Sequence, residues 1–338
     1  MVVTLIQNRN KISKKAMEEV MGFFEPDLLL IENSLKKHFA SHISFVNQVS
    51  GHILFAGGKR LRPLLTVCAA RLCGFEGEDI YDLAAVPEYL HAASLLHDDV
   101  VDGGEKRRGK TPAYKLWGNS AAVLVGDFMY ARAIELATRF EDIRIARAIS
   151  KTVALMAEGE IIQLLHAKVP SFDEETYFKV VDRKTASLIS TSCRIGAYLA
   201  KGSRDKVDAI SGYGLLVGQA FQLVDDLLDY MADSEELGKA VGTDLAEGKL
   251  TLPIVVGLEK ASPEQRERLK AILSQGYVTP SEFKWVKEVL LETGAIKYTY
   301  TRAKGLINSA CERLDIFPHS EIMENLKVLA GYVLERRK

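Results

Sequence analysis

The sequence predicts an all-α protein, and three observations support this fold class. Only 9 of the 338 residues are proline, so the chain carries few residues that break helices. Apolar residues recur at three- and four-residue steps through most of the length, as on the buried face of a helix. We find no stretch of useful length in which apolar and polar residues alternate as in a half-buried strand.

Length alone would allow about two domains, at roughly 150 residues per domain. No linker rich in glycine, proline or serine divides the chain, however, and no low-complexity tract occurs in it. We therefore expect one large helical domain over residues 26–338, preceded by an N-terminal arm of residues 1–25.

Local start and stop signals place the individual helices. Residues 119–140 have apolar residues at helical spacing, with Asn119 as the expected N-cap. The run Ser262-Pro263-Glu264-Gln265 combines an N-cap, a proline at the first helical position and a capping-box glutamine. Pro87 interrupts an apolar run, so we expect it in the first turn of its helix. The other helices are expected over residues 143–168, 173–201 and 203–230, from 279 to before 294, and from 320 to 337.

The composition argues against several broad classes of protein. Lys and Arg total 44 and Asp and Glu total 45, a net charge of −1, whereas nucleic-acid-binding proteins usually show a basic excess. No apolar run reaches the roughly 18 residues of a membrane-spanning helix, and the first residues do not form a signal peptide. The four cysteines show no CxxC spacing and suit reduced thiols. We expect a soluble, cytoplasmic protein with no nucleic-acid partner and no stable membrane insertion.

Two segments share one acidic pattern, DDxxD, and each follows an apolar helical run: YLHAASLLHDDVVD and GQAFQLVDDLLDY. Positions i and i+4 of a helix share a face, so Asp98 pairs with Asp102, and Asp225 pairs with Asp229. Acids on an apolar helix are costly to bury unless they are paired or bound to cations. Oxygen ligands suit Mg²⁺, which takes one or two carboxylates together with substrate phosphates and water.

A solvated acidic helix end, or the N-caps of following helices, would explain a single DDxxD motif about as well. Two motifs are harder to explain in that way. Asp occurs 18 times in the chain, so two such motifs would arise by chance in roughly one chain in a thousand.

Three loops rich in glycine and basic residues accompany the acidic motifs: 57–63, 102–112 and 233–253. Arg and Lys bind phosphate oxygens, and glycine lets the backbone approach an anion closely. Each cluster alone would more often be a solvated surface patch. Beside the acidic motifs, the clusters predict a pocket for one Mg²⁺-bridged diphosphate and one metal-free diphosphate. His91, two turns before Asp98 on nearly the same face, is either a phosphate contact or a structural histidine.

The motifs GGKRLRP, LLHDDVVDGGEKRRG, FQLVDDLLD and GKAVGTDLAEGKLTLP, in this order and spacing, resemble the trans-isoprenyl diphosphate synthases over roughly residues 30–330. The chain is most similar to bacterial long-chain synthases of the octaprenyl type. The resemblance implies the isoprenoid synthase fold, a single helical bundle around a deep central cavity, and a homodimer. It also implies consecutive 1′-4 condensation of isopentenyl diphosphate onto an allylic diphosphate (farnesyl or geranyl diphosphate), with about three Mg²⁺ ions per loaded site.

The resemblance also implies a role for each matching residue. The isopentenyl diphosphate ligands would be Lys59, Arg62, His91 and Arg108. The Mg²⁺ ligands would be Asp98, Asp102 and Asp225, supported by Asp99, Asp226 and Asp229. The allylic diphosphate ligands would be Arg107, Lys184 and Lys239, with Lys249 as a candidate in a lid formed by residues 233–253. Thr185 and Gln222 would line the reaction centre.

The chemistry implied by the resemblance suits these residue types. The allylic diphosphate would leave as an anion stabilised by Mg²⁺, Arg and Lys, and the isopentenyl double bond would attack the resulting allylic cation. A proton would then leave C2, with the released diphosphate as its acceptor. Water must be excluded because it would trap the cation.

Product length is expected to depend on small side chains beneath the first acidic motif. Ala93 and Ser94 lie about one turn before Asp98, where bulky aromatics limit the product in short-chain members of the family. Small residues there imply products longer than about C20, and we expect about C35–C45, with C40 the best match, for quinone side chains. Packing alone would also explain small residues at both positions. Other candidates for the tunnel floor are Tyr89, Leu90 and residues 153–165.

Several rival interpretations remain open. A short-chain farnesyl or geranylgeranyl diphosphate synthase would share every catalytic residue. A non-catalytic subunit of a heteromeric synthase should lack one acidic motif, and a terpene cyclase should lack GGKRLRP together with a second DDxxD. A simple helical protein that binds divalent cations would not explain the basic clusters.

Overall fold

The computed structural model describes residues 10–104, 110–166, 173–231 and 242–336 of the chain. Every regular element in these ranges is helical, which confirms the predicted all-α class. In chain order the elements are α2 (Asn10–Phe23), α3 (Glu25–Phe39), α4 (Ser44–Leu54), α5 (Leu61–Leu72), α6 (Asp79–Asp102), α7 (Ala113–Trp117), α8 (Asn119–Ala137), α9 (Ile143–His166), α10 (Glu174–Val181), η1 (Asp182–Ala186), α11 (Ser187–Leu199), α12 (Arg204–Met231), α14 (Thr243–Ala246), α15 (Leu252–Lys260), α16 (Pro263–Gln275), α17 (Pro280–Glu292), α18 (Ala295–Glu312), η2 (Arg313–Ile316) and α19 (Glu321–Val333).

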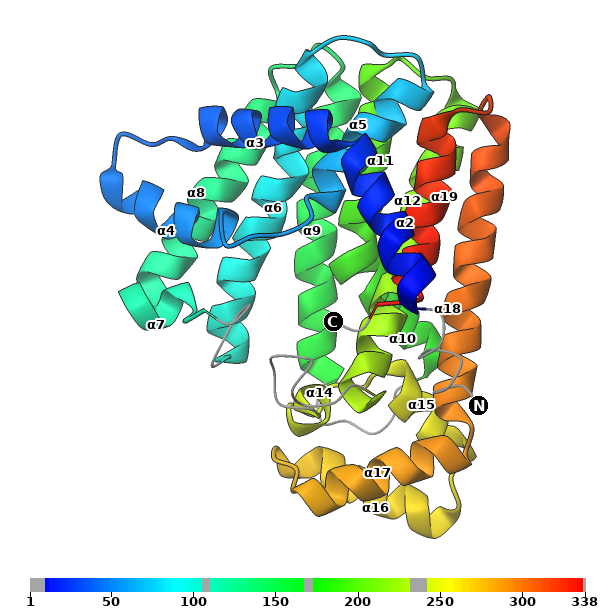
Figure 1. Cartoon of the computed structure of the whole chain (residues 1–338). Coiled ribbons are helices and arrows are strands. Elements are labelled where there is room, and N and C mark those ends of the chain that lie inside the picture. The colour runs from blue at the N-terminus through cyan, green and yellow to red at the C-terminus, as the bar shows by residue number, and fades with distance from the viewer. Residues whose placement is uncertain (1–9, 105–109, 167–172, 232–241, 337–338) are drawn as a thin grey trace.

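The helices form a bundle with α11 and α12 at its centre. Helix α11 packs against α5, α9 and α12, and α12 packs in turn against α18. Helices α6 and α8 pair on one side of this centre, and α3 crosses them (Figure 1). At the bottom of the same view, α16 and α17 form a layer that contacts the rest of the bundle through α14, α15 and α18.

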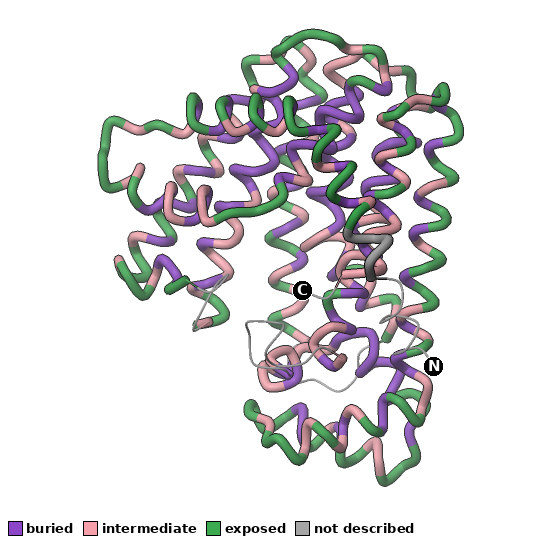
Figure 2. Tube along the Cα trace, in the orientation of Figure 1, coloured by how far each residue is buried: buried purple, intermediate pink, exposed green. Residues whose placement is uncertain are grey.

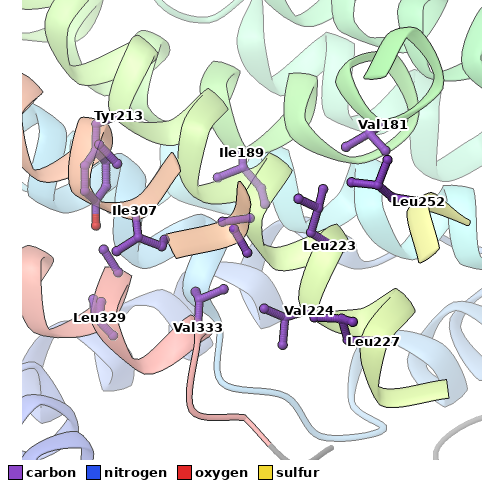
Figure 3. Packing of buried hydrophobic residues seen from close by; sticks show 14 of the residues in the cluster. Val181, Ile189, Tyr213, Leu223, Val224, Leu227, Leu252, Ile307, Leu329 and Val333 are labelled. Atoms are coloured by element: carbon purple, nitrogen blue, oxygen red, sulfur yellow. The ribbon is translucent and has the colours of Figure 1, made fainter. Parts of the chain in front are cut away.

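Apolar side chains fill the spaces between the helices in two buried clusters. One cluster joins α3, α4, α6 and α8, and the other joins α12 to the C-terminal helices. Buried positions accordingly follow the inner sides of the long helices, while the outer turns are exposed (Figure 2). In the second cluster, Leu223 of α12 lies near Val181 of α10 and Leu252 of α15 (Figure 3). These contacts fix the elements that carry the site residues described below.

Helix α2 lies within the predicted N-terminal arm. It packs against α19, and its Met17 and Val20 side chains are buried in the second cluster. The boundary at residue 26 stays a prediction.

Local signals predicted several helix starts. Ser262 and Gln265 form the expected capping box at the start of α16. Thr279 caps α17, which ends before Gly294 as predicted. Gly118, rather than Asn119, occupies the N-cap position of α8.

Three expectations about individual helices were wrong. Pro87 lies inside α6, well past its first turn, where it removes one backbone donor from the helix. The segment 173–201 is interrupted by η1, a π-helical turn between α10 and α11. Helix α19 ends at Val333 rather than at residue 337.

Among the helices that the structure describes, none is both long enough and apolar enough to cross a bilayer.

Candidate active site

A cavity of about 200 Å³ lies between α9, α10, η1, α12 and the segment that precedes α15. Apolar parts of its wall come from Val180, Val181 and Leu250. Its polar wall contains six residues predicted from sequence: Lys184, Thr185, Gln222, Asp225, Asp226 and Lys249. Residues from these five separate segments are thus brought together around one hollow.

The carboxylates of the second acidic motif have different surroundings. Asp226 is buried, and its Oδ2 accepts a hydrogen bond from the Tyr177 hydroxyl at 2.6 Å, while its Oδ1 accepts one from Gln222 Nε2 at 2.9 Å. Asp225 is exposed, and Asp229 lies one turn further along the same face of α12. Asp225 is therefore the carboxylate of this motif that a ligand reaches directly, whereas Asp226 is held by protein donors.

Acidic groups are concentrated around this motif. Burial, followed by the nearby Asp244 carboxylate, raises the pKa of both Asp226 and Asp229 to about 7. The backbone N–H of Asp244 also donates to Asp229 Oδ2 at 3.3 Å. A divalent cation would offset the repulsion between these acids.

The donor set fits Mg²⁺, since it consists of carboxylate oxygens. No three His, Cys, Asp or Glu side chains within the described ranges are grouped closely enough to bind a metal ion by themselves. Mg²⁺ commonly completes its coordination shell with substrate phosphate oxygens and water. The residues present therefore suit an ion shared with a phosphate group.

Lys184 lies on the π-helical turn η1 and points toward α9. Its Nζ lies 2.5 Å from Oε2 of Glu160 and 3.4 Å from Oε1 of Gln163. A Cβ at Gly159 would lie only 2.7 Å from the backbone nitrogen of Lys184, so a glycine is required for this close packing. Such turns occur frequently at functional sites.

The first acidic motif lies at the end of α6, next to the same cavity. The helix ends at Asp102 because Gly103 adopts a left-handed conformation with φ 64°. Oδ2 of Asp102 lies 3.6 Å from Nζ of Lys249, which lines the cavity. Asp99 is buried and Asp98 is half-buried. The motif therefore meets the cavity through Lys249.

Lys249 and Tyr130 each lie near acidic groups from more than one element. Burial lowers the pKa of Lys249, but Asp102, Asp244 and Glu247 outweigh that effect and raise it above its usual value. The pKa of Tyr130 is raised by burial and then by Asp98, Asp127 and Glu160. Asp98 of α6 and Glu160 of α9 thus act on the same phenol.

Two basic residues just before α5, Lys59 and Arg60, differ in their burial and in their partners. Arg60 is buried, with Nε 2.5 Å from Glu32 Oε1 and Nη1 2.8 Å from Glu88 Oε1, and its backbone is left-handed at φ 51°. Lys59 is exposed, and its Nζ donates to the Tyr332 hydroxyl at 3.0 Å. Arg60 therefore has a structural role.

Other predicted residues lie away from the cavity or outside the described ranges. Arg62 and His91 are half-buried on α5 and α6, which pack against each other. Neither they nor Lys59 are among the residues that line the cavity. The structure does not describe Arg107, Arg108 or Lys239, nor residues 233–241 of the loop 233–253.

The four residues predicted to control product length lie on α6. Ala93, Leu90 and Tyr89 are buried in the cluster of α3, α6 and α8, and the Tyr89 hydroxyl donates to the backbone oxygen of Leu35 at 2.7 Å. Ser94 is half-buried and donates to the backbone oxygen of His91 at 2.9 Å. None of the four lines the 200 Å³ cavity, so their role stays a prediction.

Sequence reasoning missed Tyr177, Glu160, Gln163 and Asp244. Glu160 and Gln163 stand three residues apart on an apolar stretch of α9, a spacing that could have indicated one polar face. Asp244 lies inside the motif GKAVGTDLAEGKLTLP. Tyr177 carries no such signal because its partner Asp226 is 49 residues away.

Comparisons with known proteins all identify polyprenyl synthases as similar to this chain. The family model for polyprenyl synthetase matches residues 43–290. The octaprenyl diphosphate synthase of Escherichia coli K12 is 36% identical over 95% of this chain and 99% of its own. A short-chain isoprenyl diphosphate synthase of Methanothermobacter thermautotrophicus is also 36% identical, over 86% of this chain and 90% of its own. A polyprenyl synthase structure from Caulobacter crescentus, complexed with calcium and isoprenyl diphosphate, has a TM-score of 0.90 and 35% identity, covering 95% of this chain and 98% of that one.

Proposed function

The chain belongs to the polyprenyl synthetase family and is a prenyltransferase, and on this premise we propose that it makes long all-trans polyprenyl diphosphates in a Mg²⁺-dependent reaction. Isopentenyl diphosphate would add repeatedly, by 1′-4 condensation, to an allylic primer such as farnesyl or geranyl diphosphate. The product would be about C35–C45, with C40 the best match.

One observation carries the proposal. Lys249 lies 3.6 Å from Asp102 of the first acidic motif and lines the same cavity as Asp225 and Asp226 of the second. One hollow is therefore lined by carboxylates of the second motif and by basic groups from two further segments, and Lys249 links it to a carboxylate of the first motif. This is the arrangement that a metal-bridged diphosphate requires.

Different residues would assist the first step, in which the allylic diphosphate leaves. Asp98, Asp102 and Asp225 would hold Mg²⁺, which supplies Lewis-acid stabilisation of the departing diphosphate. Lys184 and Lys249 would add positive charge on the same oxygens, as would Arg107 and Lys239.

Thr185 would face the developing allylic cation. Its hydroxyl donates to Gln222 Oε1 at 2.9 Å, so the hydroxyl lone pairs remain available to the positive charge. The apolar wall formed by Val180, Val181 and Leu250 would exclude water, which would otherwise trap the cation. The proton lost from C2 would pass to the released diphosphate.

Isopentenyl diphosphate would bind on the side of α5 and α6. Lys59, Arg62, His91 and Arg108 are the proposed ligands. Lys59 is exposed, and Arg62 and His91 are half-buried. All three side chains therefore have surface that a ligand can contact.

The long product is supported by similarity to octaprenyl diphosphate synthase and by the small Ala93 side chain on α6. A short-chain synthase is the alternative, because a short-chain relative is equally identical over a smaller part of the chain.

A homodimer is also part of this proposal. Leu124 of α8 and Leu164 and Leu165 of α9 are 66%, 53% and 70% exposed, and a second copy would cover them. Light scattering of the purified chain should give twice the monomer mass. A monomeric mass at micromolar concentration would contradict the dimer.

The direct test uses purified chain, farnesyl diphosphate, labelled isopentenyl diphosphate and Mg²⁺, followed by dephosphorylation and chain-length chromatography. We expect a ladder that ends near C40 and disappears with EDTA. A single product of C15 or C20 would support the short-chain alternative, and no elongation of any allylic primer would contradict the proposed function.

A further inference from the structure

Tyr177 belongs to no motif, yet it is joined to the reaction centre by a chain of hydrogen bonds. Its hydroxyl donates to Asp226 Oδ2 at 2.6 Å, and Gln222 Nε2 donates to the other carboxylate oxygen at 2.9 Å. Thr185 in turn donates to Gln222 Oε1 at 2.9 Å. The chain therefore runs from α10 through α12 to η1, along the wall of the cavity.

The direction of each hydrogen bond in this chain is determined by chemistry. The Gln222 amide nitrogen can only donate, so it donates to Asp226 Oδ1, and the Tyr177 hydroxyl donates to Asp226 Oδ2. The Gln222 amide is then oriented with nitrogen toward Asp226 and oxygen toward Thr185, which makes the threonine hydroxyl a donor. Burial raises the pKa of Tyr177 well above its usual value, so the phenol keeps its proton.

The surroundings leave little room for rearrangement. Tyr177 is 4% exposed and Asp226 is 3% exposed. The backbone N–H of Leu252 also lies 3.5 Å from Asp226 Oδ2. Leu252, Val181 and Leu223 lie close together in one buried cluster and join α15, α10 and α12 (Figure 3).

We propose that Tyr177 is a positioning residue for prenyl transfer: by donating to Asp226, it orients Gln222 and, through Gln222, the Thr185 hydroxyl that faces the allylic carbon. The proposal rests on the proposed function. Tyr177 would not contact either substrate diphosphate, since those groups are assigned to the metal ligands and the basic side chains. Loss of its hydroxyl should therefore lower kcat and leave the KM of both substrates nearly unchanged.

Tyr213 offers a matched control for loss of a buried tyrosine hydroxyl. It is fully buried, and its hydroxyl donates to the backbone oxygen of Leu326 at 2.7 Å. It lies on α12, as Asp226 does, but does not line the cavity. Tyr177→Phe and Tyr213→Phe each remove one buried tyrosine hydroxyl, but only Tyr177→Phe removes a hydrogen bond at the cavity, so the two should differ in their effect on catalysis.

The experiment compares these two variants in the full chain by steady-state kinetics and thermal unfolding. Because one buried hydrogen bond to the Asp226 carboxyl group is lost, kcat of Tyr177→Phe should fall about 10-fold, with both KM values within about 3-fold of the wild type. Tyr213→Phe should keep the wild-type kcat.

A double-mutant cycle tests whether Tyr177 acts through the chain. Thr185→Val removes the last hydroxyl, so Tyr177→Phe/Thr185→Val should be little slower than the slower single variant. Tyr213→Phe/Thr185→Val should instead show the product of its two single effects.

Three outcomes would overturn the inference. The first is a kcat for Tyr177→Phe equal to that of Tyr213→Phe. The second is multiplicative effects of Tyr177→Phe and Thr185→Val. The third is a wild-type chain that elongates no primer, which alone would overturn the proposed function as well.

Discussion

Lys249 Nζ lies 3.6 Å from Oδ2 of Asp102, although Lys249 belongs to the segment before α15 and Asp102 ends α6. Glu247 holds the same ammonium group at 2.6 Å. Because Lys249 also lines the cavity beside Asp225, one side chain connects the two acidic motifs. The loop that was expected to contribute a lid therefore already supplies a charge at the site.

Replacement of Lys249 should weaken binding and use of the allylic diphosphate. Lys249→Met keeps the aliphatic stem and removes the charge, so kcat/KM for the allylic substrate should fall about 10-fold or more, the usual effect of losing one charge-assisted hydrogen bond. Steady-state kinetics with varied primer measure this. Lys270→Met, which breaks an ion pair with Glu267 away from the cavity, is the control. Equal kinetics for the two variants would refute the role of Lys249.

The second acidic motif should determine the dependence on magnesium through Asp225. Asp225→Asn removes the exposed carboxylate, so kcat should fall about 100-fold and more Mg²⁺ should be needed for half-maximal rate. A Mg²⁺ titration of activity measures both effects. Asp208→Asn changes another exposed aspartate of α12, paired with Arg204, and serves as the control. An unchanged titration curve for Asp225→Asn would show that this carboxylate does not bind the ion.

Enlarging Ala93 should shorten the product. Its side chain is fully buried on α6, one turn before Asp98, so Ala93→Phe would introduce a ring where the growing chain is expected to pass. Chain-length chromatography should show products several isoprene units shorter. Ala93→Ser, which adds little volume, should leave the product length unaltered. An active Ala93→Phe variant with the wild-type ladder would mean that Ala93 is small only for helix packing.

Arg60 and Lys59, which are neighbours before α5, should differ in function: Arg60 should affect stability and Lys59 should affect substrate binding. Arg60→Met leaves Glu88 buried without its partner and should lower the free energy of unfolding by about 3–5 kcal/mol. Lys59→Met should cost less than about 1 kcal/mol, because Lys59 is exposed, but should raise the KM for isopentenyl diphosphate. Urea unfolding and steady-state kinetics of both variants separate the two effects. Similar stability losses would contradict this division.

Local chemistry predicted the features that depend on neighbours in sequence. The capping box of Ser262 and Gln265 forms within three residues, and the two acidic motifs follow from helical spacing alone. The close packing of Lys184 against Gly159 of α9 could not be predicted in this way, because the two residues are distant in sequence. Tertiary contacts of this kind are absent from any local pattern.

The roles of other site residues depend on partners that are distant in sequence and could not be predicted from local patterns. Arg60 and Lys59 look alike in sequence, and only the positions of Glu32 and Glu88 make Arg60 structural. Tyr177 belongs to the site only because α10 packs beside α12, which brings its hydroxyl to Asp226.

A crystal structure with Mg²⁺ and an unreactive allylic thiolodiphosphate tests the central claim most directly. We expect the diphosphate to lie in the cavity, with Mg²⁺ ions bound by Asp98 and Asp102 on one side and by Asp225 on the other. A diphosphate bound elsewhere, or ions held by only one of the two motifs, would contradict this account.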